Sequence, residues 1–454
     1  MMPQTRSNTR THSRPLTLAL AVAMSLGLGA CSIIDSDDDE LETPSLGNRT
    51  PILSRISAEV AVDPLLANVA VVVPPAEANT DWTQSGRNAA KATGHVALGA
   101  APVRAWQVSI AGTSPTRRLA ASPVIGDGKL FAVDSSGVIH AFAADTGRSL
   151  WSHTIVVEND LRDATFGGGA TYFEGKIYAT SGTGDVVALD ANTGTEMWRK
   201  KPAGPLRGSP TVAYSAVYVM TQDNQIHALN ITDGTPIWQD AAAIGQQGVF
   251  GVAAPGAGQG SVVAGYSSGE VVAYRYENGR VLWSDALART SISTEVGALT
   301  DVDADPIVSN GQVFALGVGG RMAAYELTTG QRIWELTVAG ISTPALAGEW
   351  IFALTDDARL LAIARNTGHV RWISQLARWR DPDDLKGPIF WTGPVLAGNR
   401  LWVASSEGEV HSIDVTTGVS SLFAELSDGV SLPPVVANNT LYILDDGGKI
   451  TAWR

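Results

Sequence analysis

Short runs in which apolar and polar residues alternate recur along most of this chain, and such alternation indicates β-strands. A clear example is Lys-Ile-Tyr-Ala-Thr at residues 176–180. Around it, glycine or Asn/Asp turns separate four β-rich runs, which cover residues 170–172, 176–180, 186–190 and 196–199. Turns this tight predict four short antiparallel strands in one small sheet.

The pattern is repeated, and each copy contains a phrase like ALDANTGTEMW at residues 188–198. Seven copies align on a glycine, which is Gly147, Gly194, Gly234, Gly279, Gly330, Gly368 or Gly418. The steps between these glycines are 47, 40, 45, 51, 38 and 50 residues, the spacing of propeller blades rather than of helical solenoid repeats. Six copies have tryptophan four residues past the glycine, and the seventh has Leu422 there.

A single sheet of this kind cannot bury both of its faces, so we expect the repeats to stack radially. The tryptophan of each repeat supplies a large apolar surface for contact with the next sheet. The glycine before it makes the turn into the outermost strand, because glycine tolerates positive φ. Helical patterning is scarce, so the sequence indicates an all-β fold.

The two ends of the repeat region predict the number of blades. The last repeat stops at Arg454, with Ala452 at the position of Ala188, so it lacks the Thr-Gly turn and the outer strand. Residues 102–108 form an orphan strand that carries Trp106. Joining the two ends gives an eight-bladed β-propeller over residues 80–454, closed by N- and C-terminal strands. Seven blades is the alternative if these ends do not pair.

The N-terminus has the features of a secretion signal. Three arginines and no acid precede an apolar stretch at residues 16–30, which is shorter than the roughly 20 residues of an ordinary membrane span. The stretch ends in Leu-Gly-Ala before Cys31, the only cysteine in the chain. We therefore expect residues 1–30 to be a lipoprotein signal peptide and Cys31 to become an acylated N-terminus. The alternative is an ordinary signal peptide followed by an incidental cysteine.

Residues 31–79 are expected to form an acidic tether and an extended arm. Ser32 follows the cysteine, and by resemblance to the sorting pattern of bacterial lipoproteins this favours the periplasmic face of the outer membrane. Removal of residues 1–30 deletes three positive and no negative residues, so the formal charge changes from −13 to −16. Such an acidic surface argues against nucleic acid as a partner.

No catalytic, cofactor-binding or metal-binding site is predicted. The glycine clusters at 167–169 and 182–184 do not open a helix within a βαβ unit, as a phosphate-binding loop requires. Three histidines occupy one repeat position where other copies have Val, Ala or Leu, which is typical of packing: His140, His227 and His411. Asp190 and Asp414 share a position that also holds Ala, Asn, Arg and Glu, which favours a turn role.

The phrase A-x-D-x-x-T-G-x-x-x-W at residues 188–198 resembles the tryptophan-docking motif of quinoprotein-type propellers. One family with this motif is the periplasmic dehydrogenases that use pyrroloquinoline quinone. Resemblance to them implies a vicinal cysteine pair over the cofactor and a calcium ion. This chain has one cysteine, at the predicted lipidation site, so the sequence argues against an enzyme and the dehydrogenase stays as the alternative.

The lipobox, the tether and a single ring more closely resemble the BamB family of outer-membrane assembly lipoproteins. Leu206-Arg207-Gly208 is similar to the family's Leu-Arg-Gly loop, and Asp301-Val302-Asp303 to its Asp-x-Asp loop. The resemblance implies that these loops contact the periplasmic domains of the insertase BamA. It also implies a non-catalytic scaffold that works with other assembly lipoproteins, and with unfolded outer-membrane proteins as further candidate partners.

Both loops connect an outer strand to the innermost strand of the next blade, and all such loops are expected on one face of the ring. We expect Leu206 to be exposed there as an interface anchor. Arg207, Asp301 and Asp303 are expected to recognise complementary charges on the partner. The alternative is that each motif caps a strand or makes a local salt bridge.

Overall fold

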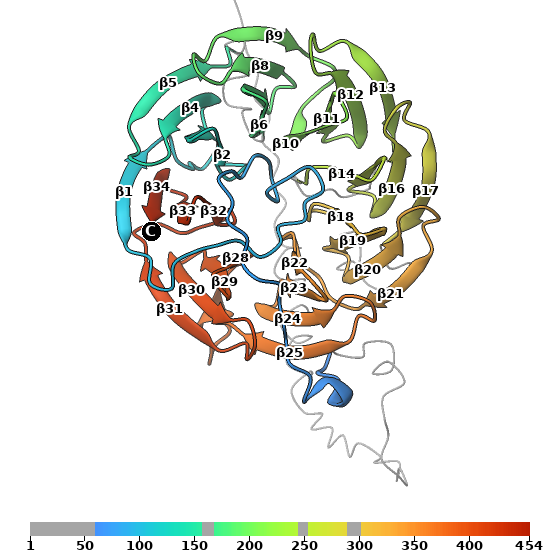
Figure 1. Cartoon of the computed structure of the whole chain (residues 1–454), viewed down its shortest axis with the longest axis vertical. Helices are drawn as coiled ribbons and strands as arrows, with labels where there is room; N and C mark the ends of the chain where they lie inside the picture. The colour runs from blue at the N-terminus through green and yellow to red at the C-terminus, as the bar shows by residue number, and fades with distance from the viewer. Residues whose placement is uncertain (1–59, 157–167, 244–252, 288–300) are drawn as a thin grey trace, which may run out of the picture. The chain divides into compact units, whose positions relative to one another are not determined.

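The computed structural model describes residues 60–156, 168–243, 253–287 and 301–454. The compact unit that contains them extends from residue 58 to residue 454. Its described part has eight four-stranded antiparallel sheets around a common centre (Figure 1), one two-stranded hairpin and a 3-10 helix, η2 (Pro64–Leu66). The predicted eight-bladed propeller is confirmed.

Seven blades are each made of four consecutive strands, ordered from the centre outward. The first four are β2 (Val124–Gly126), β3 (Lys129–Val133), β4 (Val138–Ala143), β5 (Ser149–Thr154); β6 (Ala170–Phe173), β7 (Lys176–Thr180), β8 (Val186–Asp190), β9 (Glu196–Lys200); β10 (Leu206–Ala213), β11 (Ala216–Thr221), β12 (Gln225–Asn230), β13 (Pro236–Ala241); and β14 (Gly256–Gly258), β15 (Ser261–Gly265), β16 (Glu270–Arg275), β17 (Val281–Ala286). The other three are β18 (Ile307–Ser309), β19 (Gln312–Gly317), β20 (Arg321–Glu326), β21 (Arg332–Leu336); β22 (Ala345–Ala347), β23 (Trp350–Leu354), β24 (Arg359–Ala364), β25 (Val370–Gln375); and β28 (Trp391–Ala397), β29 (Arg400–Ser405), β30 (Glu409–Asp414), β31 (Ser420–Glu425).

The eighth blade joins the two ends of the propeller. Its strands are β32 (Val435–Ala437), β33 (Thr440–Leu444), β34 (Lys449–Trp453) and, outermost, β1 (Arg104–Ser109). β1 pairs antiparallel with β34, and Val103 and Arg454 exchange two backbone hydrogen bonds of 2.6 and 2.9 Å. The ring is therefore closed without a covalent bond, as the sequence predicts.

Seven of the eight joints between blades in the described chain contain a docked tryptophan. The indole Nε1 donates a hydrogen bond of 2.7–3.2 Å to a backbone carbonyl of the next blade. The donors are Trp106, Trp151, Trp198, Trp238, Trp283, Trp334 and Trp372. At Gly194, whose φ is +71°, a Cβ would come within 2.6 Å of the Trp151 ring. The glycine of the phrase is thus required by its backbone conformation and by the ring that lies on it.

The eighth joint, between the blade β28–β31 and the closing blade, has Leu422 at the tryptophan position. Leu422 is 52% exposed. The closing blade has no Thr-Gly turn to receive an indole, because its outer strand comes from the other end of the chain. Phe423 packs at this joint instead, with its ring centroid 5.0 Å from that of Trp402 and 6.1 Å from that of Trp453. The missing tryptophan of the seventh copy matches a missing docking site.

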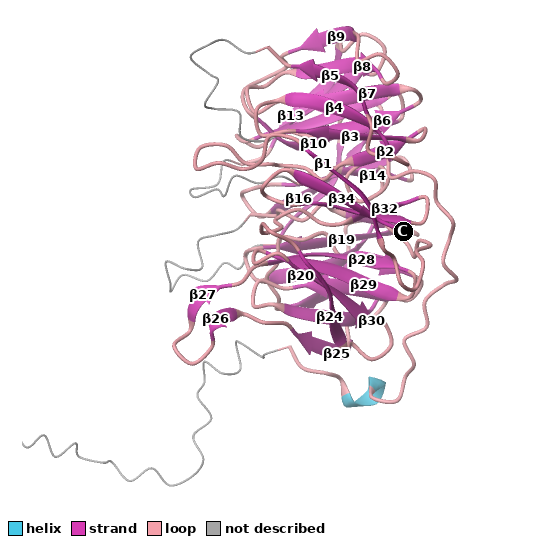
Figure 2. Ribbon diagram, turned by 90° about the vertical axis from the view of Figure 1, so that its left-hand side faces the viewer, coloured by secondary structure: helices cyan, strands magenta, loops and turns pink. Residues whose placement is uncertain are grey.

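Because each blade has an even number of antiparallel strands, every connection from an outer strand to the next inner strand leaves the ring on the same face, which we call the loop face. The opposite face, which carries the Thr-Gly turns, is called the turn face. Between β25 and β28 the loop face carries a hairpin of β26 (Trp379–Asp381) and β27 (Lys386–Pro388). This hairpin projects on the side of the ring opposite to η2 (Figure 2).

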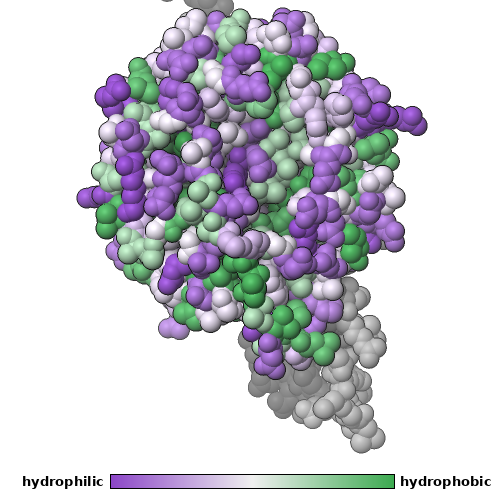
Figure 3. Space-filling model, in the orientation of Figure 1, coloured by the Kyte–Doolittle hydropathy of each residue, from purple (hydrophilic) through white to green (hydrophobic). Residues whose placement is uncertain are grey.

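Residues 79–98 cross the centre of the ring on the turn face and form what we call the plug (Figure 1). Backbone groups of the plug and the side chains of Asn79 and Gln84 form hydrogen bonds with the innermost strands of seven blades, at Ile125, Tyr172, Val212, Ala257, Val308, Leu396 and Val436. Innermost strands have one edge without a strand neighbour, and the plug satisfies part of that edge. On the turn face, hydrophilic and hydrophobic residues are interspersed (Figure 3).

Candidate partner-binding site

The two sequence motifs lie in two chain segments that are two blades apart. The motif Leu206–Gly208 was expected to be a loop, but it forms the start of strand β10. Leu206 and Arg207 begin β10, directly after the connection from β9. Asp301 and Asp303 lie in the connection between β17 and β18. The blade β14–β17 stands between these two inner strands in the order of the ring.

Arg207 brings the two motifs together. Its Nη2 donates hydrogen bonds to Oδ1 of Asp301 at 2.9 Å and to Oδ1 of Asp303 at 3.0 Å. The three side chains are 1%, 0% and 7% exposed. The motifs therefore do form a salt bridge, but a buried one between segments 94 and 96 residues apart rather than a local one. We call Arg207, Asp301 and Asp303 the ionic cluster.

The ionic cluster has two carboxylates for one guanidinium. Burial, followed by the neighbouring charge of Asp301, raises the pKa of Asp303 to about 6, and Arg207 opposes this rise. The charge of Asp356 also acts on Asp303 in the same direction as Asp301. Asp356 itself is exposed. The buried part of the site therefore has two carboxylates for one guanidinium.

Several polar atoms of the ionic cluster have no hydrogen-bond partner among the described residues. They are Nε and Nη1 of Arg207 and Oδ2 of Asp301. Buried polar groups in folded proteins are nearly always hydrogen bonded, so unpaired ones call for a functional or structural reason. The cluster thus has donors and an acceptor that are available to another group.

Leu206 does not have the exposure expected from the sequence. It is fully buried and belongs to an apolar cluster with Tyr178, Val212 and Val217. The reason is that β10 is the innermost strand of its blade, where side chains pack between neighbouring sheets. The expectation of an exposed anchor at Leu206 was wrong.

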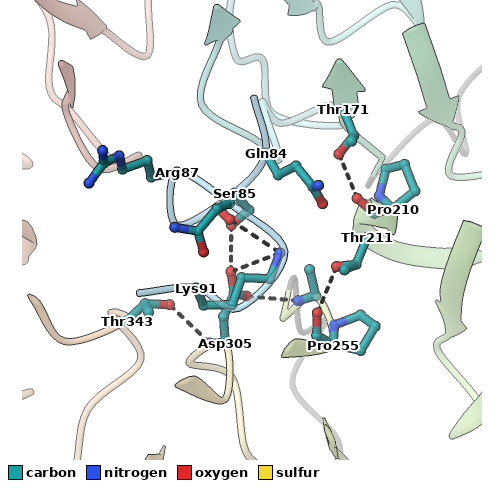
Figure 4. A network of polar contacts seen from close by, with 12 residues as sticks. Gln84, Ser85, Arg87, Lys91, Thr171, Pro210, Thr211, Pro255, Asp305 and Thr343 are labelled. Carbon is teal, nitrogen blue, oxygen red and sulfur yellow. Dashed lines mark hydrogen bonds and ion pairs between the residues drawn. The ribbon is translucent and has the colours of Figure 1, made fainter. Parts of the chain in front are cut away.

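A third aspartate of the same run was not identified from the sequence. Asp305 accepts hydrogen bonds from Ser85 Oγ and from the backbone N–H of Ala254, and its Oδ2 lies 4.0 Å from Lys91 Nζ (Figure 4). Lys91 is fully buried and also donates to the carbonyl of Ser85. Asp301, Asp303 and Asp305 stand at alternate positions of one run, and this period of two was the signal that could have indicated Asp305.

Exposed apolar side chains also occur in the connections of the loop face. They are Val156 (71% exposed), Ile341 (53%), Leu385 (62%) and Phe390 (64%). Leu385 is in the β26–β27 hairpin and Phe390 follows it, in the segment leading to β28. Exposed apolar side chains are the kind of group that forms the buried core of a protein interface.

The structure places the three histidines of the repeat on three different blades, in β4, β12 and β30. His140 contacts Asp134 at 2.8 Å, and His411 contacts Ser420 at 2.7 Å. They do not converge on one site. Cys31 lies outside the described residues, among which no helix is long and apolar enough to cross a membrane.

Comparison with known proteins connects this geometry to a family. A family model described as outer membrane protein assembly factor BamB matches residues 135–374. The protein of that name from Escherichia coli (strain K12) is 30% identical over 390 residues, which cover 77% of this chain and 88% of the relative.

The solved structures that share the fold include a BamB protein and an alcohol dehydrogenase. The crystal structure of BamB from Moraxella catarrhalis superposes with a TM-score of 0.62 at 20% identity, over 78% of this chain and 99% of that one. Quinohemoprotein alcohol dehydrogenase from Comamonas testosteroni superposes with a TM-score of 0.65 at 14% identity, over 82% of this chain and 80% of that one. At these identities the likeness concerns the arrangement of blades alone.

Proposed function

Because the chain belongs to the BamB family of outer membrane protein assembly factors, we propose that it is a non-catalytic scaffold that supports the folding and insertion of outer-membrane proteins. The relatives that it matches over most of their length are named as assembly factors rather than as enzymes. The likeness to the alcohol dehydrogenase is one of fold, so it does not favour the dehydrogenase alternative.

The proposed principal partner is the insertase BamA, whose periplasmic domains would bind the loop face at the ionic cluster. The observation that carries this proposal is the convergence of Arg207, from the start of β10, with Asp301 and Asp303, from the β17–β18 connection. Three polar atoms of this cluster have no hydrogen-bond partner among the described residues. Leaving a buried polar group unpaired costs about 1–3 kcal/mol. A binding role explains why the chain retains that cost.

The cluster is buried in the free protein, so contact with it requires a local opening of the loop face. A carboxylate or carbonyl of the partner would then pair with Nε and Nη1 of Arg207. A partner N–H or O–H group would pair with Oδ2 of Asp301. Exposed apolar residues such as Phe390 and Ile341 would cover the surrounding area and exclude water from these polar contacts.

The remaining parts of the proposal concern the anchor and further partners. Acylation of Cys31 would hold the ring at the periplasmic face of the outer membrane, close to the insertase and to other assembly lipoproteins. The β26–β27 hairpin has two strands only, and its open edges suit the addition of a strand from an unfolded outer-membrane protein.

Two experiments test this function. The lipidated protein is purified from envelope extracts and the proteins that accompany it are identified by mass spectrometry. We expect the insertase among them, and its absence would contradict the scaffold. Separately, the purified protein is incubated with pyrroloquinoline quinone, calcium, an alcohol or sugar and an artificial electron acceptor. We expect no turnover, whereas robust oxidation would favour the dehydrogenase.

A further inference from the structure

We infer that Gln84 and Lys91 of the plug are positioning residues for partner binding, because they fix the two chain segments that carry the ionic cluster. This inference rests on the proposed function of the cluster. It assigns to the plug a role beyond closing the centre of the ring.

Gln84 holds the first segment, β10. Its Oε1 accepts from the backbone N–H of Val212 and its Nε2 donates to the carbonyl of the same residue, both at 3.0 Å. The pairing of β10 with β11 is irregular between Arg207 and Thr211. Gln84, which is 3% exposed, binds the backbone of Val212 directly after this irregular stretch, where regular pairing of β10 with β11 has resumed. It therefore fixes the end of β10 that follows the irregular stretch.

Ser85 and Lys91 hold the second segment, residues 301–305. Both converge on Oδ2 of Asp305, two residues after Asp303 (Figure 4). Burial lowers the pKa of Lys91, and the charge of Asp305 opposes this. A buried charge needs compensation, and Asp305, 4.0 Å away, is the acidic group that faces Lys91. The plug and this segment are therefore joined by this pair and by the hydrogen bond from Ser85.

The ionic cluster needs this fixation because its two sides come from different blades. Arg207 Nη2 must lie near 3 Å from both carboxylates, and hydrogen bonds weaken steeply when their geometry is disturbed. The lead-in to β14 provides one bridge between the two segments, through Thr211 Oγ1 to the carbonyl of Pro255 and the N–H of Ala254 to Asp305. Residues 84–91 of the plug provide a second bridge on the turn face.

The test uses the full mature chain and the purified periplasmic domains of the insertase. The double variant Gln84→Ala, Lys91→Met removes both plug contacts but keeps the apolar stem of the lysine. The milder variant Ser85→Ala serves if the double variant does not fold. The matched control is His95→Ala, which removes buried plug contacts with Pro74 and Asn399 at another part of the ring. Binding is measured by calorimetry, and hydrogen exchange of the free protein is measured on peptides that cover residues 301–305.

We expect the double variant to bind at least tenfold more weakly and its 301–305 amides to exchange at least tenfold faster, with both unchanged in His95→Ala. Unchanged exchange in the double variant, or equal losses in it and in His95→Ala, would overturn the inference. A cluster variant with Arg207→Met, Asp301→Asn and Asp303→Asn distinguishes the proposed binding site from the positioning role of the plug. If that variant binds normally, the proposed site fails, and the exchange result still decides whether the plug positions the cluster.

Discussion

Trp106 lies directly opposite Ala452 in the antiparallel register that closes the ring. The indole of Trp106 also donates to the carbonyl of Ala144 in the next blade, at 3.2 Å. One residue near the start of the propeller is therefore held both by the last strand of the chain and by the first complete blade. The stability of the ring depends on this junction, because no covalent bond joins the two ends.

Trp106→Ala is expected to destabilise the whole propeller rather than one blade. The change removes the docked indole and its hydrogen bond, and the replacement of a packed tryptophan typically costs about 3–5 kcal/mol. Thermal unfolding followed by circular dichroism checks this. The matched control is Trp379→Ala in the β26–β27 hairpin, which should change the midpoint little. Equal midpoints for the two variants would contradict the importance of the closure.

Leu422→Trp, which restores the repeat consensus, is expected not to stabilise the protein. The closing blade lacks the glycine turn on which the other indoles dock, so a tryptophan here would stay largely in solvent. We expect a change within about 0.5 kcal/mol, as for other surface substitutions. Urea unfolding measures it, and a gain of 2 kcal/mol or more would show that the joint contains an unrecognised docking site.

The raised pKa of Asp303 predicts a specific pH dependence of stability. Its pKa is about 6 in the folded chain, against 3.8 as the ordinary value. The folded state therefore binds a proton in a range where the unfolded state does not, so the contribution of this group to stability rises as the pH falls from about 7 toward 4. Asp303→Asn should reduce the gain in unfolding free energy between pH 7 and pH 5 by about 1–2 kcal/mol. Parallel pH profiles for the two proteins would contradict this.

Cys31→Ala is expected to abolish lipid anchoring. Without the thiol there is no acceptor for acyl chains, so the protein should appear in a soluble or unprocessed form after fractionation of cell envelopes. Mass spectrometry of the mature N-terminus gives the direct readout. A variant that is processed and membrane-bound like the wild type would disprove the anchor.

The blade architecture could be predicted because the same physical requirement recurs in every blade. Each docked tryptophan needs a turn glycine in the next blade, as Trp151 needs Gly194. Glycine and tryptophan therefore recur together, four residues apart, in six of the seven phrases. The pairing of residues 104–109 with residues 449–453 could also be predicted, because the last repeat lacks an outer strand and the N-terminal segment is a strand without a blade. The sequence showed that Leu422 departs from the tryptophan pattern. The reason became clear only from the structure, in which the closing blade has no Thr-Gly turn to receive an indole.

The burial of the candidate site could not be predicted, because it depends on contacts between distant segments. Nothing near Arg207 in the sequence indicates that its guanidinium reaches Asp301. Leu206 was expected in a loop, whereas it begins the innermost strand of its blade and pairs with Thr221 of β11. The plug could not be predicted either, since its partners are mainly backbone groups of seven different blades.

The burial also changes the best test of the site. Charge reversal at Arg207 would place a third carboxylate against two buried aspartates, so lost folding would accompany lost binding. The combined variant Arg207→Met, Asp301→Asn, Asp303→Asn removes all the charges together and leaves none unpaired, which folded proteins tolerate better. The control is Arg148→Met with Asp127→Asn and Asp145→Asn, which makes the same kinds of change at exposed positions of the turn face.

The most direct measurement is the affinity of these two variants and of the wild type for the purified periplasmic domains of the insertase, with melting curves recorded in parallel. We expect the cluster variant to stay folded and to bind at least about tenfold more weakly, a loss of about 1.4 kcal/mol or more, and the turn-face variant to bind like the wild type. Wild-type affinity in a folded cluster variant would show that the interface lies elsewhere on the ring.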